Sequence, residues 1–292
     1  MKKILFALLF AVSAQAWSQE LIRIFTPYSA THSGTPLMMR VIDRANQAQS
    51  TYRFVLEFRP GGNQLLALQA ATDRSLAIIA PSFAEHVSAG TVSQDDFVPV
   101  LTLGEACWAV IAGEPLNQAR EIVVGSVAPG NATHLTAMML GERFNRAVVY
   151  VGFKSNNDAL INMAGNNGVN MAIDRWEAWD SLRNLNPGMQ VFAASCGHRL
   201  PQAPTVPTLR EMGVDAPQVF NIVVAPRGWD AEHRRAVASV LQTALAQIPA
   251  AEVFAISGMT VPTVSTEQYY ARSIAKVRRI QDRYRDQIQK IR

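Results

Sequence analysis

Two patterns alternate along the chain: short apolar runs typical of buried strands, and segments whose apolar residues recur every three or four positions, as in helices. The predicted strands of the first half are residues 21–28, 52–58, 75–80, 98–103 and 107–112. The alternation restarts after residue 120, and the further predicted strands are residues 121–126, 146–153, 169–174, 189–195 and 221–226. Strands separated by helices predict an α/β fold with mostly parallel sheets flanked by helices.

The two runs of alternation predict two lobes. We expect residues 17–112 and 222–292 to form lobe I and residues 113–221 to form lobe II, with chain crossings near 107–116 and 218–226. In open α/β sheets, ligands bind beyond the carboxyl ends of the strands. A site between the lobes would therefore be lined by the loops that follow the strands.

Helices are predicted between the strands and at the end of the chain. Pro36 stands at a plausible first helical position, and residues 158–165 and 231–248 have helical spacing. Near the C-terminus, apolar residues recur at intervals of three and four: Ile274, Val277, Ile280, Tyr284, Ile288 and Ile291. We expect the chain to end in an amphipathic helix.

The N-terminus has the layout of a secretory signal peptide. Lys2 and Lys3 precede a short apolar core, and Ala14-Gln15-Ala16 supplies a small-x-small cleavage pattern. The apolar core is too short for a membrane-spanning helix, which is the alternative interpretation. We expect residues 1–16 to be a signal peptide and the mature protein to be periplasmic.

Composition narrows the classes of partner. The chain is 49% hydrophobic and 17% charged, which indicates a folded protein with a large core. Its formal charge of +4 falls to about +2 without Lys2 and Lys3. This balance gives no support for a nucleic-acid partner.

Cys107 and Cys196 are the only cysteines. An oxidising compartment would permit a disulfide, but sequence does not reveal whether the two Cα atoms approach closely enough. Two buried, unpaired thiols are the favoured expectation. Two cysteines are too few for a Cys-rich metal site, and we expect no metal and no cofactor.

The strand-to-helix segment GSVAPGNATHL, residues 125–135, is rich in small and hydrogen-bonding residues. One interpretation is a helix cap, with Asn131 or Thr133 accepting from first-turn amides. The other is a cradle for a carboxylate or phosphate at a helix N-terminus. The candidate residues are Ser126, Gly130, Asn131, Thr133 and His134. His134 suits a metal ligand, a general base or a simple hydrogen-bonding group.

A second polar loop, SATHSGT, follows the first predicted strand. It is either an ordinary solvated turn or the other side of a clamp on a small anion. Its hydrogen-bonding residues are Ser29, Thr31, His32, Ser33 and Thr35.

Two further positions follow predicted strands. Lys154 is either a surface cation or a partner for an anion, and Asp174 either accepts from a ligand or caps a helix. Trp176 and Trp179 suit the floor of a pocket or, alternatively, core packing.

Several motifs in order resemble the periplasmic solute receptors of tripartite tricarboxylate transporters, the Bug family. They are TPYSA, RPGGN, DDFVPV, GSVAPGNATHL, VGFKSNNDAL with VNMAID, PTVPTLREMG and VVAPRGWDAE, and they cover nearly all of residues 21–292. The resemblance implies a two-lobe periplasmic-binding-protein type II fold with the ligand between the lobes. It also implies capture of a small organic carboxylate for membrane transporter subunits. We expect a monomer without enzymatic activity.

In the family, the loop after the first strand and the GSxxxGxxTHL loop close on a ligand carboxylate, largely through backbone amides and waters. By this resemblance the ligand-binding residues are Tyr28, Ser29, His32, Ser33, Thr35, Ser126, Gly130, Asn131, Thr133, His134, Phe153, Lys154 and Asp174. The sequence departs from the family where Pro36 replaces an Asp and where Ser155-Asn156 replaces Gly-Gly. The loss of that Asp favours a plain carboxylate over an amino acid.

Two other functions remain open at this point. A ligand-sensing receptor for a membrane signalling protein would share the same fold. An exported hydrolase would need a triad such as Ser126, His134 and Asp174, but the chain has no GxSxG, HExxH, P-loop or GxGxxG motif.

Overall fold

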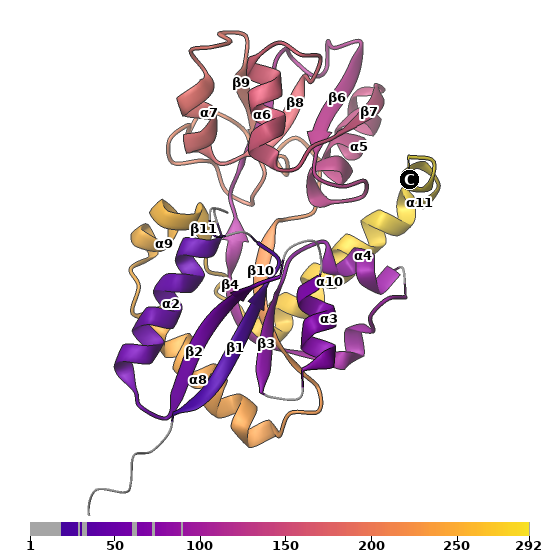
Figure 1. Cartoon of the computed structure of the whole chain (residues 1–292). Helices are drawn as coiled ribbons and strands as arrows, with labels where there is room; N and C mark the ends of the chain where they lie inside the picture. Colours follow the sequence, from indigo (N-terminus) through magenta and orange to yellow (C-terminus); the bar gives the residue numbers. More distant parts are fainter. Residues whose placement is uncertain are drawn as a thin grey trace, which may run out of the picture.

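The computed structural model describes residues 19–28, 30, 34–59, 63–71, 74–88 and 90–291. The predicted signal peptide, residues 1–16, lies outside the described residues. The chain forms two β-sheets in separate layers, each with its own helices, and two strand connections run between them (Figure 1).

The first sheet has the strand order β11-β4-β10-β3-β1-β2. Its strands are β1 (Glu20–Thr26), β2 (Tyr52–Phe58), β3 (Ser75–Ile79), β4 (Phe97–Ala106), β10 (Phe220–Pro226) and β11 (Met259–Thr260). Strand β1 pairs in parallel with β2 and β3, whereas β10 runs antiparallel to β3 and β4. The short β11 runs antiparallel to β4 and forms one edge.

The second sheet has the strand order β7-β6-β8-β5-β9. Its strands are β5 (Ala109–Ala112), β6 (Glu121–Ser126), β7 (Ala147–Gly152), β8 (Met171–Asp174) and β9 (Gln190–Ala194). Strand β6 pairs in parallel with β7 and β8, and β5 runs antiparallel to β8 and β9.

One expectation from the sequence is wrong. The sheets are mixed, because β10 re-enters the first sheet from the side of the second and must therefore run against β3. Strand β5 belongs to the second sheet, so the chain passes from the first sheet to the second at residues 107–108, within the range expected for the first crossing.

Helices cover both sheets. The first sheet carries α2 (Thr35–Ala48), α3 (Asn63–Ala70), α4 (Phe83–Ser88), α8 (Ala231–Ala246), α9 (Ala250–Ser257) and α10 (Thr266–Arg283), and α10 continues into α11 (Arg285–Gln289). The second carries α5 (Ala132–Phe144), α6 (Asn156–Ala164) and α7 (Trp176–Leu182). Pro36 lies in the first turn of α2, as predicted. Among the described residues no single helix is long and apolar enough to cross a membrane; α8 and α9 meet that test only together, bent by 91°.

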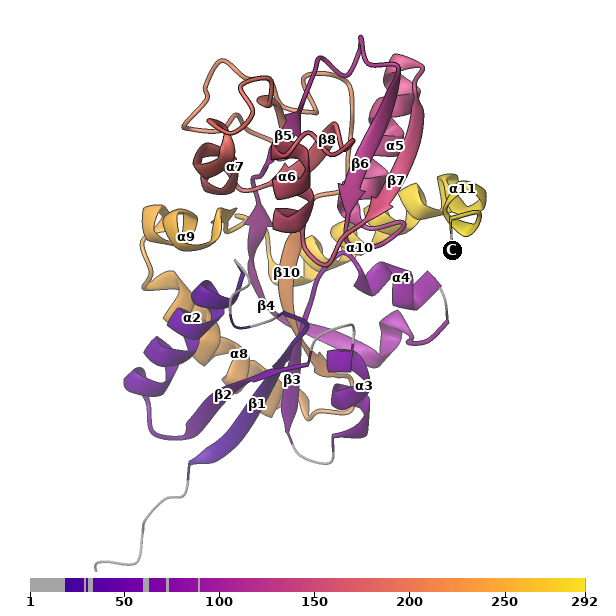
Figure 2. The same ribbon diagram turned by 45° about the horizontal axis from the view of Figure 1, so that its top comes forward.

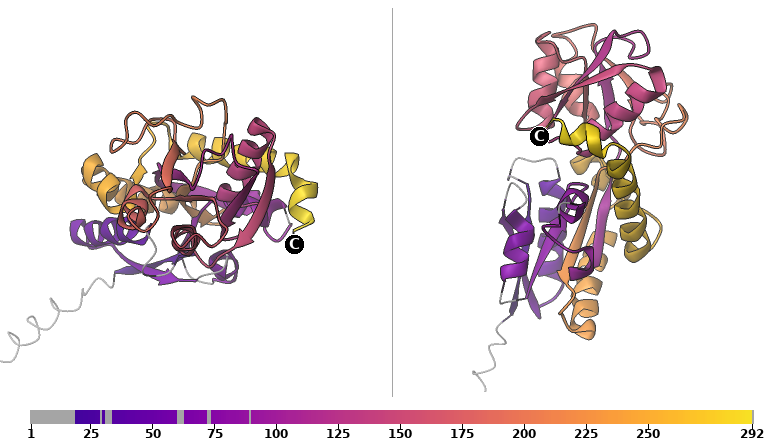
Figure 3. Two further views of the ribbon diagram at one scale, coloured as in Figure 1. Left: turned by 90° about the horizontal axis from the view of Figure 1, so that it is seen from above. Right: turned by 90° about the vertical axis from the view of Figure 1, so that its right-hand side faces the viewer.

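The C-terminal helices connect the two layers. Ile274 of α10 is fully buried in the same apolar cluster as Phe25 of β1, whereas Ile288 of α11 packs in that cluster with Leu135 of α5. Figure 3 shows α10 and α11 running along the side of both layers. The Tyr284 hydroxyl donates to Glu142 Oε2 of α5 over 2.5 Å. The predicted amphipathic helix therefore extends from the first sheet onto the second.

Candidate functional site

The loops predicted to bind a ligand follow strands whose carboxyl ends point toward the other sheet. In Figure 1 and Figure 2 the arrowheads of β1 and β6 are directed into the region between the two layers. Because β7 and β8 are parallel to β6, their carboxyl ends lie at the same edge as Ser126. The crossings also pass through this region.

Side chains in the 125–135 segment bond mostly to one another. Ser126 is completely buried, and its Oγ donates to Asn131 Oδ1 over 2.6 Å. The same oxygen accepts the His134 amide proton over 3.0 Å, which makes Asn131 the N-cap of α5. The helix-cap interpretation is confirmed for Asn131.

His134 stabilises the loop from within. It is 1% exposed, and its Nδ1 lies 2.9 Å from the Gly130 amide nitrogen, which donates to it. Burial lowers the pKa of His134 to about 4. The imidazole is therefore neutral near pH 7, with its proton on Nε2, and its ring centroid lies 5.1 Å from that of Tyr150.

Gly130 occupies a backbone conformation with φ +81° that disfavours other residues. A Cβ at this position would lie 3.3 Å from Ile288 Cδ1 of α11. Gln281 Nε2 of α10 donates to the Gly130 carbonyl over 3.3 Å. The C-terminal helices thus support the back of the loop.

Unpaired backbone amides remain at the start of α5. The amides of Ala132 and Thr133 have no acceptor among the described residues, whereas the next amide bonds to the cap. First-turn amides and the helix dipole favour an anion at this end. The loop therefore offers a ligand mainly its backbone, because the Ser126 and His134 side chains are already used.

On the first sheet, the described part of the predicted clamp consists of Tyr28 and Thr35. The Tyr28 hydroxyl donates to Asn221 Oδ1 of β10, and burial raises its pKa above the usual range. Thr35 is buried at the start of α2. Ser29, Thr31, His32 and Ser33 lie outside the described residues.

The remaining predicted residues follow β7 and β8. Phe153 is half-buried against the core of the second sheet, and Lys154 is exposed with no hydrogen bond or ion pair among the described residues. Asp174 is 7% exposed, and burial raises the pKa of its carboxyl group. Its Oδ1 accepts from the Arg175 amide over 2.7 Å.

The tryptophan pair after β8 belongs to the core. The rings of Trp176 and Trp179 lie 4.6 Å apart, and Trp179 Nε1 donates to the Met189 carbonyl over 3.0 Å. Trp179 is buried and Trp176 packs against the same apolar cluster. Core packing, and not a pocket floor, accounts for this pair.

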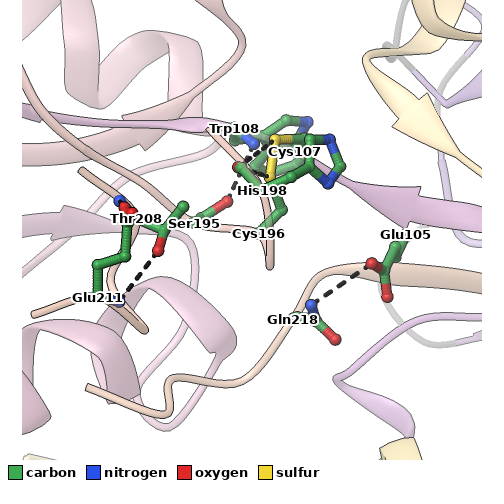
Figure 4. The surroundings of a disulfide bond; sticks show 9 residues. All are labelled: Glu105, Cys107, Trp108, Ser195, Cys196, His198, Thr208, Glu211 and Gln218. Atoms are coloured by element: carbon green, nitrogen blue, oxygen red, sulfur yellow. Dashed lines mark hydrogen bonds between the residues drawn. A yellow bond between two sulfur atoms is a disulfide. The ribbon is translucent and has the colours of Figure 1, made fainter. Parts of the chain in front are cut away.

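Cys107 and Cys196 form a disulfide, so the expectation of two unpaired thiols is wrong (Figure 4). Their Cα atoms lie 4.8 Å apart although 89 positions separate them in sequence. The bond ties the first crossing to the segment after β9. His198 lies beside the disulfide. Among the described residues, three metal-ligating side chains converge at Cys107, Cys196 and His198, but both sulfurs are held in the disulfide.

The residues considered for hydrolysis are not arranged as a triad. The Ser126 hydroxyl proton is directed to Asn131, and His134 Nδ1 accepts from a backbone amide. No hydrogen bond joins Ser126, His134 and Asp174 among the interactions of the described residues.

No protein-family model matches the chain, and no curated protein matches its sequence. Among solved structures, the chain is similar to R. palustris Rpa4515 with adipate, with a TM-score of 0.71, 18% identity, and coverage of 94% of this chain and 98% of that one. MatC (Rpa3494) from Rhodopseudomonas palustris with bound malate has a TM-score of 0.68 and 17% identity, covering 89% and 98%. A TctC solute-binding protein from Polaromonas, without ligand, has a TM-score of 0.68 and 16% identity, covering 91% and 99%.

The chain therefore has the two-lobe fold of periplasmic solute-binding proteins, as the motifs predicted. The similarity to TctC and Bug proteins inferred from those motifs is confirmed at the level of structure.

Two residues with polar donors in the region between the sheets, Trp108 and Arg175, were not singled out in the sequence. Trp108 is part of an apolar run and Arg175 simply follows Asp174, so neither carries a sequence signal.

Proposed function

We propose that this chain is an extracytoplasmic solute-binding protein that captures a small organic carboxylate for a tripartite tricarboxylate-type transporter. The observation that carries the proposal is the pair of unpaired amides at Ala132 and Thr133, at the edge of the second sheet that is directed toward the first. Lys154, exposed at the end of the neighbouring strand, adds a positive charge. Amide donors beside a cation suit a carboxylate.

The ligand would bind between two lobes that correspond to the two sheets. We assign residues 17–108 and 220–292 to lobe I and 109–219 to lobe II, adjusted from the sequence boundaries for the positions of β5 and β10. Closure by hinge motion at the crossings would bring the loop after β1 onto the ligand. In this proposal Tyr28, Ser29, His32, Ser33 and Thr35 contribute to ligand binding, as the resemblance implies.

Roles of the other residues follow from their contacts. Ser126, Asn131 and His134 would shape the loop and hold its amides in place, since their side chains bond within it. Gly130 would permit the turn, and Phe153 and Asp174 would line the edge of the site.

An extracytoplasmic location has three supports. The N-terminal sequence has the features of a signal peptide, and the disulfide is of a kind that persists in oxidising compartments. The similar structures include periplasmic binding proteins. We propose that the protein acts as a monomer that docks on membrane transporter subunits. It binds and releases its ligand without chemical change.

The test is thermal unfolding of the purified protein against a panel of simple carboxylates, aromatic acids and amino acids. A ligand present at 100 times its Kd adds about 2.7 kcal/mol to the free energy of unfolding, which raises Tm by a few degrees. We expect a carboxylate, and not an amino acid, to give the largest increase. A panel in which amino acids alone stabilise the protein would contradict the proposed ligand class.

A pair of variants tests whether the amides at the start of α5 bind the ligand. Ala132→Pro removes one first-turn amide at the position where helices tolerate proline, and Asn131 already has the extended backbone that must precede it. Ala132→Val adds similar bulk and keeps the amide. We expect the proline variant to bind the carboxylate about tenfold more weakly than the valine variant. Equal affinity would mean that these amides do not contact the ligand.

A further inference from the structure

Trp108 and Arg175 come together at the edge of the second sheet where the ligand loops lie. Ala109 of β5 pairs with Asp174 of the antiparallel β8. The next residues beyond this pair, Trp108 and Arg175, are therefore neighbours at one end of the sheet. This end is shared with the carboxyl end of β6 and its loop, because β8 and β6 are parallel. In the strand order, β8 separates β6 from β5.

Both residues carry a buried donor without a partner. Trp108 is 5% exposed, and its indole Nε1–H has no acceptor among the described residues. The Nε–H of Arg175 is likewise buried and unpaired. Buried polar groups are nearly always hydrogen-bonded, so two such donors in one place point to an acceptor that binds there.

The two donors meet at Gly258, where the first layer contacts the second. A Cβ built on Gly258 would lie 3.5 Å from Arg175 Cγ and 3.7 Å from Trp108 Nε1. The Gly258 carbonyl accepts from the Cys107 amide over 2.9 Å, which holds the glycine against the crossing. The absent side chain leaves a small cradle next to both donors.

Among the described residues, no other group of this region satisfies them. The Trp108 amide and carbonyl both bond to Ser195, and the nearest carboxyl group along the chain, Asp174, accepts from the Arg175 amide and not from its guanidinium. Figure 4 shows Trp108 beside the disulfide, which fixes its backbone at the crossing. The backbone that carries the Trp108 donor is therefore held in place in advance of any ligand.

We propose that Trp108 Nε1 and Arg175 Nε form a second anion subsite, which takes the distal carboxylate of a dicarboxylate whose first carboxylate lies at the α5 amides. This inference rests on the proposed function and specifies its ligand class. Strands β6 and β5 are two positions apart in the sheet, which corresponds to about 10 Å at the usual spacing of neighbouring strands. That spacing suits a short dicarboxylic acid lying across β8, with one hydrogen-bonded carboxylate at each end.

The test compares matched acids in calorimetric titrations of the disulfide-bonded protein: adipate with hexanoate, and succinate with butyrate. In the wild-type protein we expect one of the dicarboxylates to bind at least about tenfold more tightly than its monocarboxylate partner. Trp108→Phe keeps the ring and removes the N–H, so it should remove most of that difference and leave the monocarboxylate affinity unchanged. Trp229→Phe, at a partly buried position where the ring packs against His233 of α8, is the control and should change neither affinity.

The glycine offers a second pair of variants. Gly258→Ala places a methyl group in the cradle, whereas Gly213→Ala introduces the same kind of positive-φ strain where no heavy atom lies within 4 Å of the new Cβ. Only Gly258→Ala should weaken dicarboxylate binding. In NMR spectra, the indole N–H signal of Trp108 is identified as the one that is missing from Trp108→Phe. In the wild-type protein this signal should move downfield when the dicarboxylate is added.

The outcomes separate the two proposals. Selective loss of dicarboxylate affinity in Trp108→Phe, together with the shift of its indole signal, supports the second subsite. If carboxylates bind, but Trp108→Phe keeps the wild-type preference and the indole signal does not move, the donors are satisfied by buried water and this inference is wrong. If no carboxylate binds the wild-type protein at all, the proposed function itself fails.

Discussion

Two regions at the same end of the second sheet differ in how their polar groups are paired. In the loop after β6, the Ser126 hydroxyl, the Asn131 side chain and the His134 imidazole bond to one another or to the loop backbone. Beside the crossing, Trp108 and Arg175 have buried donors without partners in the part of the chain that the structure describes, while a disulfide holds the backbone of the crossing. Side chains of the loop after β6 hold the loop backbone in place through hydrogen bonds. At the crossing the disulfide holds the backbone, so side-chain donors stay available for a ligand. A ligand would accordingly meet amides on one side and side-chain donors on the other.

The largest effect is expected at the crossing, from removal of the disulfide. Because the bond closes a loop spanning 89 positions, the Cys107→Ser and Cys196→Ser double variant should lose about 4 kcal/mol of the free energy of unfolding. Urea denaturation without a reductant measures the loss. A reductant should destabilise the wild-type protein to a similar extent and leave the double variant unchanged. Equal stability of the wild-type and variant proteins would show that the disulfide does not hold this region together.

The next effect is a pH dependence that arises in the loop. The pKa of His134 is about 4 in the folded protein against an ordinary value of 6.5, so the unfolded chain binds the proton more tightly. Stability is therefore fully present above pH 6.5 and falls as the pH drops toward 4, by about 3 kcal/mol. His134→Gln should remove this component of the pH dependence, and His198→Gln, at an exposed position, should retain it. An unchanged profile in His134→Gln would contradict the buried neutral imidazole.

Removal of the helix cap should have a somewhat smaller effect. Asn131→Ala deletes the N-cap of α5 and also leaves the buried Ser126 hydroxyl without its acceptor, which together cost about 2 to 3 kcal/mol. Ser155→Ala is the matched control, since Ser155 caps α6 with one bond to the Asp158 amide. The control should lose about 1 kcal/mol. Chemical denaturation of both variants tests the difference, and equal losses would argue against the Ser126–Asn131 bond.

The smallest effect is expected from Gly130→Ala, at about 1 to 2 kcal/mol. The alanine would have an unfavourable backbone conformation, and its methyl group would lie 3.3 Å from Ile288 Cδ1, so α11 must shift slightly. Gly213→Ala has the same conformational strain without a neighbour and should lose about 1 kcal/mol. A larger loss in Gly213→Ala than in Gly130→Ala would mean that α11 does not support the loop.

Much of the architecture followed from local patterns. Strand β2 has the predicted bounds, residues 52–58, and Asn131 was a candidate cap because short polar side chains favour that position. The orientation of β10 was not predictable, since periodicity does not indicate which neighbour a return strand pairs with. The short β11 and helix α9 were likewise not predicted.

The site was less predictable than the fold. The pattern identified His134 as a polar residue, but its role as an acceptor for the Gly130 amide depends on how the loop turns. The pairing of Cys107 with Cys196 depends on a 4.8 Å Cα separation created by both crossings together. Trp108 and Arg175 become candidates only when burial and missing partners are known, which are properties of the packed structure.

Calorimetric titration of carboxylates into the purified protein, unfolded and refolded to release any bound acid, tests the central claim most directly. We predict saturable binding of at least one small carboxylate at one site per chain, with weaker binding in Ala132→Pro than in Ala132→Val. Failure of every acid to bind the refolded protein, or wild-type affinity in Ala132→Pro, would contradict a carboxylate site at the start of α5.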